Sequence, residues 1–79
     1  MNHPHKFELF VDNVKFEWDK NTISGVDLRR LAGIPENVQI FEHVPGKPDV
    51  EIKNDTVVNL EKHHGPVKFS TQSPGSQAG

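Results

Sequence analysis

The side chains best suited to bind a metal ion in this sequence are histidines. His63 and His64 are adjacent, Glu61 precedes them closely, and His3 and His5 stand near the amino terminus. Imidazole is a common ligand of transition metals. Adjacent residues in a strand point to opposite faces, and no third ligand stands at a fixed spacing from the pair. We therefore expect a solvated loop at residues 63–64 and no metal site.

Groups for covalent or acid–base catalysis are equally sparse. The chain has no cysteine, which excludes thiolate nucleophiles, disulfides and cysteine-ligated zinc. Ser24 has no histidine partner at a recognisable spacing, so its hydroxyl is expected to cap a helix. The aspartates at predicted turns are expected to bond their own backbone. They are Asp12, Asp19, Asp49 and Asp55. We therefore do not expect an enzyme.

The composition indicates one small domain. The chain has 79 residues, 33% of them apolar, and a formal net charge of −2. A chain this short has a single core and little room for an enclosed substrate pocket. Its charge does not supply the field that nucleic-acid binding needs, and no apolar run approaches the roughly 20 residues of a membrane span. We expect a cytoplasmic protein without a secretory leader that binds neither nucleic acid nor a membrane.

Residues 6–19 alternate as two β-strands do. The predicted inward residues are Phe7, Leu9, Val11, Phe16 and Trp18. Asp12 and Asn13, between the two runs, suit a tight turn, so the segment predicts a hairpin. Phe10 breaks the alternation, so the first strand is either covered on both faces or carries an exposed aromatic residue. Trp18 is expected to lie in the core or to anchor the end of the sheet under the helix.

A short helix is predicted after the hairpin. Ser24 and Asp27 have the spacing of a capping box, and Gly33 stands where a helix ends in a left-handed residue. The inner face of this helix would carry Leu28, Leu31 and Ala32, and its solvated face Arg29 and Arg30. A helix of about ten residues is marginal in water by itself. Its apolar stripe must therefore pack on a sheet.

The second half of the chain predicts short strands and then a tail. Residues 38–44, 49–53 and 67–69 have strand patterns, and residues 57–60 form another buried apolar stretch. From residue 70 onward Ser, Thr, Gln, Pro and Gly dominate, so this part has no apolar face to bury and is expected to be disordered. The predicted organisation is a flexible arm at residues 1–6, one domain at residues 7–69 and a flexible tail at residues 70–79.

This order of elements is an α+β plan in which one helix lies across a mixed sheet of four to five strands. It resembles the ubiquitin family and its β-grasp fold. The resemblance is carried by the hairpin, by Thr22-Ile23 before the helix, by Gly33-Ile34-Pro35 after it, and by a last strand leading into a tail that ends in glycine. The resemblance covers nearly the whole chain and implies the same fold.

A narrower resemblance points to bacterial ubiquitin-like domains called multi-ubiquitin domains. It rests on the Trp that ends the second strand and on three further motifs. These are Ile23-Ser24-Gly25, Leu31-Ala32-Gly33-Ile34-Pro35, and Val44-Pro45-Gly46 followed by Pro48-Asp49-Val50. In that family such domains are encoded beside an activating-type enzyme, a conjugating-type enzyme and a metal-dependent deubiquitinase-type peptidase.

The family's partners would therefore be partners of this chain, together with target proteins. The resemblance implies a bacterial protein modifier that is monomeric when free. It would need no cofactor of its own, because ATP is used by the activating enzyme.

The resemblance also makes Gly79 the residue that carries the function. Its unhindered carboxylate would be adenylated, passed to a partner's thiol, and joined to a target by an amide or ester bond. The preceding tail residues, Ser76, Gln77 and Ala78, would thread the enzyme's channel. Ubiquitin and the sulfur carriers end in two glycines, whereas Ala78 precedes Gly79 here. Either the extra methyl is tolerated, or the partners read a different tail, or Gly79 is exposed by processing of a longer precursor.

Docking on partners would use the exposed face of the sheet. The candidates are Phe10 and Phe41, which are out of step with the inward residues, with His43 and Lys68 as a polar rim. A register shifted by one residue would instead bury Phe41 and expose Ile40.

Two other functions remain open from the sequence. One is a sulfur carrier of the same fold, against which the single terminal glycine and the motif at residues 31–35 both argue. The other is a non-covalent binding module with a passive tail.

Overall fold

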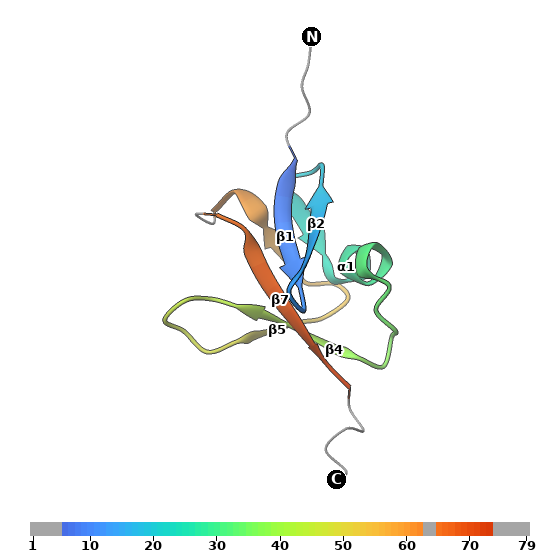
Figure 1. Ribbon diagram of the computed structural model, residues 1–79. Coiled ribbons are helices and arrows are strands. Elements are labelled where there is room, and N and C mark those ends of the chain that lie inside the picture. Colours follow the sequence, from blue (N-terminus) through green and yellow to red (C-terminus); the bar gives the residue numbers. More distant parts are fainter. Residues whose placement is uncertain (1–5, 63–64, 74–79) are drawn as a thin grey trace.

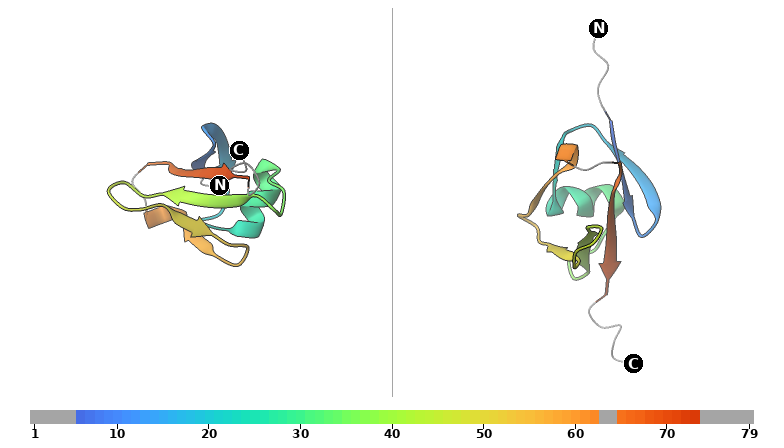
Figure 2. Two further views of the ribbon diagram at one scale, coloured as in Figure 1. Left: turned by 90° about the horizontal axis from the view of Figure 1, so that it is seen from below. Right: turned by 90° about the vertical axis from the view of Figure 1, so that its left-hand side faces the viewer.

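The computed structural model describes residues 6–62 and 65–73 (Figure 1). The elements in chain order are β1 (Phe7–Val11), β2 (Val14–Trp18), β3 (Thr22–Ser24), α1 (Gly25–Ala32), β4 (Gln39–His43), β5 (Val50–Ile52), β6 (Val57–Asn59), the 3-10 turn η1 (Leu60–Lys62) and β7 (Val67–Gln72). Five strands form a mixed sheet in the order β2-β1-β7-β4-β5, and β3 pairs with β6. Figure 2 shows α1 lying across one face of this sheet. The arrangement is a ubiquitin-like β-grasp, as expected.

One apolar core lies between α1 and the inner face of the sheet. The buried residues are Leu9, Val11, Ile23, Leu28, Ile40, Ile52, Val58, Leu60, Val67 and Phe69. Leu28 is fully buried, while Leu31 and Ala32 are partly buried against the same cluster. The predicted apolar stripe of the helix is therefore confirmed. This packing stabilises a helix that is too short to persist by itself.

The local signals of the hairpin and the helix are confirmed. Asp12 and Asn13 have φ angles of 52° and 69°, as a tight hairpin turn requires. The Ser24 hydroxyl accepts a hydrogen bond from the backbone N–H of Asp27 at 3.1 Å, and the Asp27 carboxylate accepts one from Ser24 N–H at 3.1 Å. Gly33 ends α1 with φ 68°. Trp18 is partly buried against the core and donates from Nε1 to Thr22 O at 2.8 Å.

Two strands differ from the prediction. Residues 22–24 form strand β3, because they pair with β6 from Thr22↔Asn59 to Ser24↔Val57. Three residues are too few to show an alternating pattern, so this strand forms only because β6 pairs with it. In addition, β7 continues to Gln72, three residues past the predicted end, because β4 pairs with it as far as Gln39↔Gln72. The expectation of disorder from residue 70 onward is therefore wrong for residues 70–72.

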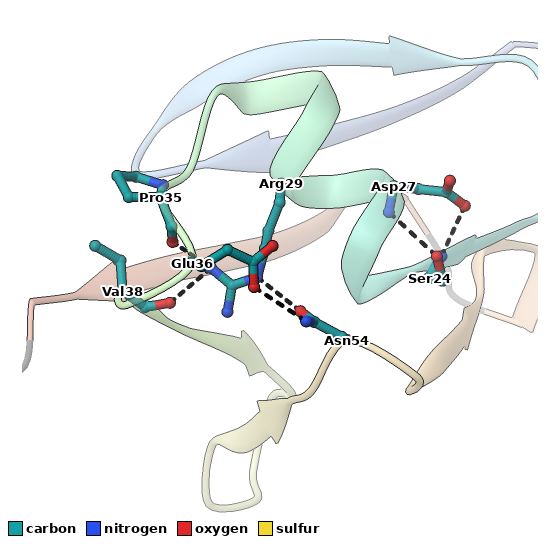
Figure 3. A network of polar contacts seen from close by, with 7 residues as sticks. All are labelled: Ser24, Asp27, Arg29, Pro35, Glu36, Val38 and Asn54. Carbon is teal, nitrogen blue, oxygen red and sulfur yellow. Dashed lines mark hydrogen bonds and ion pairs between the residues drawn. The ribbon is translucent and has the colours of Figure 1, made fainter.

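The prediction for Arg29 is also wrong, whereas Arg30 is exposed as expected. The Arg29 side chain is only 11% exposed. Its Nη1 donates to the carbonyl oxygens of Pro35 and, at 2.8 Å, of Val38, and its Nε donates to Asn54 Oδ1 at 2.8 Å (Figure 3). Arg29 thus joins α1 to the segment after it and to the loop before β6.

Candidate functional site

The four predicted docking residues lie on the outer face of the sheet, opposite α1. Phe10 of β1 is the Cα partner of Lys68 of β7, and Lys68 is the partner of His43 of β4. These three residues therefore form one row across three strands, since directly paired residues point to the same face. Phe41 stands in the next row, beside Ser70. The structure brings the predicted residues onto one surface, with Lys68 and Ser70 between the two aromatic side chains.

The register of β4 decides which aromatic or aliphatic residue is available to a partner. Ile40 is fully buried, whereas Phe41 is partly exposed on the opposite face. Glu42 returns to the inner face and is only 8% exposed. The shifted register, which would have buried Phe41, is therefore excluded. Phe10 is also partly exposed, so β1 carries an aromatic residue on the outer face.

The rim of this outer face carries charges of both signs. His43 Nδ1 lies 2.9 Å from Asp49 Oδ1, and both side chains are about half exposed. Lys15 Nζ lies 3.1 Å from Glu8 Oε2 at the β1–β2 side. Asp49 thus contacts a neighbouring side chain, where a bond to its own backbone had been expected. Exposed pairs of this kind contribute about 0 to 1 kcal/mol to stability, so they can be rearranged by a partner at little cost.

Ser70 is one residue of this surface that the sequence did not indicate. It pairs with Phe41 across β4 and β7, but its polar surroundings placed it in the predicted tail. The available signal was the alternation of Val67, Phe69 and Thr71 with Lys68, Ser70 and Gln72, which continues past the last large apolar residue.

A second feature lies where β7 ends. Asp12 of the hairpin turn accepts hydrogen bonds from the backbone N–H of Thr71 at 2.9 Å and from the Thr71 hydroxyl. Asp12 N–H also donates to Phe69 O at 3.0 Å. The turn at the far end of the hairpin is therefore bonded to the start of the C-terminal segment, and the expectation that Asp12 bonds its own backbone is wrong.

A groove of about 410 Å³ lies beside this contact. Its apolar walls come from β2, through Val14 and Phe16, and from the segment that follows α1, through Ile34 and Val38. Thr71 and Ser73 line the same groove, so it reaches the last described residue of the chain.

Other predicted site residues fall outside the described part of the chain. These are Gly79 and the tail residues Ser76, Gln77 and Ala78. The histidines weighed as metal ligands, His3, His5, His63 and His64, also lie outside it. Within residues 6–62 and 65–73, no group of three or more His, Cys, Asp or Glu side chains is placed to hold a metal ion. No helix among these residues is long and apolar enough to cross a membrane.

The fold defines a ubiquitin-like protein. The sequence profile described as multiubiquitin matches residues 7–71. The chain therefore belongs to the multiubiquitin family, as the motifs in the sequence suggested. No curated protein and no solved structure matches the chain.

Proposed function

We propose that this chain is a bacterial protein modifier that is attached to targets through the carboxylate of Gly79. The single observation that carries the proposal is the multiubiquitin match over residues 7–71. The outer face around Phe10 and Phe41 supports it, because a modifier needs a surface by which its enzymes recognise the folded domain. In this proposal the catalytic groups belong to those enzymes, and the chain itself catalyses no step.

The proposed reaction uses one group of this chain in four steps. The Gly79 carboxylate attacks the α-phosphorus of ATP and releases pyrophosphate, which gives an acyl adenylate. A thiolate of the activating-type enzyme displaces AMP to form a thioester, which then passes to a thiol of the conjugating-type enzyme. A target amine or hydroxyl displaces that thiol and forms an amide or an ester. A metal-dependent deubiquitinase-type peptidase would reverse the attachment. Because the proposed pathway needs ATP and free thiols, we expect it to operate in the cytoplasm.

Removal of Gly79 should abolish covalent attachment. The carboxylate would then belong to Ala78, whose methyl group hinders the acyl transfer and whose position is one residue short of the enzyme's reacting groups. The measurement is intact mass and gel analysis of the chain coexpressed with activating-type and conjugating-type enzymes, with and without Gly79. An extension beyond Gly79 serves as a control, because it tests whether a free glycine carboxylate is required.

Other outcomes of this experiment would assign the alternative functions. A mass gain equal to one sulfur-for-oxygen exchange, in the presence of activating enzyme, ATP and sulfide, would indicate a sulfur carrier. Partner binding that survives the loss of Gly79, without an adduct from the full chain, would indicate a non-covalent binding module. Either result would overturn the modifier proposal.

Phe41→Ala should weaken non-covalent docking by about tenfold, because it removes a partly exposed aromatic anchor from the outer face. The free energy of unfolding should change little, since Phe41 lies on the face away from the core. Titration of the folded chain against an activating-type enzyme measures the affinity, and a thermal melt checks the fold.

Val57→Ala is the matched control for this substitution. Val57 is an exposed apolar residue, 63% accessible, on the separate β3–β6 ladder. It should leave the affinity unchanged. Equal losses in the two variants would show that the outer face is not the docking surface.

A further inference from the structure

The pairing of β7 with its two neighbouring strands ends at different residues. On one side, β4 pairs with β7 through Ser70, Thr71 and Gln72. On the other side, the pairing with β1 ends at Val11↔Phe69, because the chain turns at Asp12 immediately afterwards. Beyond Phe69, therefore, β7 has a strand on only one side.

Asp12 takes the place of the missing strand. Its own N–H donates to Phe69 O at 3.0 Å, which completes the β1 side of the ladder. Its carboxylate then accepts from the next N–H on that side, that of Thr71, at 2.9 Å, and from the Thr71 hydroxyl. Asp12 has a φ of 52°, and its side chain reaches β7, whereas β2 lies on the other side of β1. One turn residue thus extends the parallel ladder by two residues.

We propose that Asp12 is a positioning residue that fixes the point at which the C-terminal segment leaves the sheet. This inference rests on the proposed function, because a fixed starting point matters to an enzyme that must reach Gly79 from the docked domain. From Ser73 to Gly79 there are seven residues, which can span at most about 25 Å. When Asp12 holds Thr71, the segment that ends in the Gly79 carboxylate starts after Gln72. This starting point lies beside the groove that Thr71 and Ser73 line.

Release of Thr71 would change both the residue at which the C-terminal segment leaves the sheet and the length of that segment. The last residues of β7 would keep pairs only on the β4 side, so they would open more often. An enzyme that binds the domain and the carboxylate together would find the competent arrangement less populated, which lowers the apparent affinity without changing the chemistry.

The first test uses two glycine substitutions in the same turn. Asp12→Gly removes the carboxylate and keeps a residue that accepts positive φ. Asn13→Gly makes the same kind of change at φ 69° and leaves the carboxylate in place. Hydrogen exchange of the Thr71 amide, followed by NMR, should accelerate at least tenfold in Asp12→Gly and stay within twofold in Asn13→Gly. An unchanged Thr71 exchange rate in Asp12→Gly would overturn the inference.

The second test separates positioning from a general loss of structure. With an activating-type enzyme, Asp12→Gly should raise the KM for this chain about three- to tenfold and leave kcat within twofold, while Asn13→Gly should change neither. Faster Thr71 exchange with an unchanged KM would show that the contact does not position the segment. A wild-type chain that is not activated at all would refute the proposed function, and the exchange measurement would still decide whether Asp12 holds Thr71.

Discussion

Gly25→Ala should lower the free energy of unfolding by about 4 kcal/mol. Gly25 is buried at the first turn of α1, and its N–H donates to Thr56 O at 3.0 Å. A Cβ atom at this position would overlap the carbonyl oxygen of Lys53 and lie 2.7 Å from Lys53 C and 2.9 Å from Asn54 Cα. These are backbone atoms, which cannot turn aside as a flexible side chain could. Either the helix or the loop before β6 must therefore shift.

The measurement for Gly25 is urea unfolding followed by the fluorescence of Trp18, the one tryptophan of the chain. Gly46→Ala is the control, because a Cβ there meets nothing within 4 Å, although the φ of 78° strains an alanine. That variant should lose about 1 to 2 kcal/mol. If Gly25→Ala lost no more than Gly46→Ala, the close packing of the loop against the start of α1 would be refuted.

Arg29→Ala should lower the free energy of unfolding by about 2 to 4 kcal/mol. The substitution removes the guanidinium that donates hydrogen bonds to Pro35 O, Val38 O and Asn54 Oδ1. The Arg29 side chain is 11% exposed, and its bond to Val38 O is partly buried, so water replaces that bond poorly. The segment between α1 and β4 would lose its attachment to the helix.

Arg30→Ala is the matched control, because it removes the same side chain from an exposed position one residue further along α1. It should change the stability by no more than about 0.5 kcal/mol. Arg29→Lys should recover little, since one ammonium group cannot reproduce the fork of a guanidinium. Thermal unfolding of the three variants side by side would contradict this account if Arg29→Ala and Arg30→Ala melted together.

Part of this structure follows from short-range patterns in the sequence. The turn at Asp12 and Asn13, the capping box of Ser24 and Asp27, and the end of α1 at Gly33 each depend on residues within four positions of one another. Backbone conformation and local hydrogen bonds decide such features, so the residue types suffice to predict them.

The outer face was predictable in part, for a related reason. The pattern of β4 allowed either Ile40 or Phe41 to be buried, and the structure buries Ile40. Alternation along one strand has a period of two, and the buried Ile40 therefore places Phe41 on the opposite face. The same argument places Phe10 and Lys68 opposite the buried residues of β1 and β7. The β-grasp plan then follows from the order of a hairpin, a helix and short strands.

Only the tertiary structure decided the contacts between segments that are distant in the sequence. Local pattern predicts Arg29 to be solvated, Asp12 to bond its own turn, and Thr71 to belong to a disordered tail. In the fold, Arg29 meets Asn54, and Asp12 meets Thr71. The sequence determined the alternation along the strands and where the helix starts and stops, because those depend on neighbouring residues. The fold decided that Ile40, and not Phe41, faces the core. Which polar side chains are buried, and where the tail begins, depends on which segments the folded chain brings together.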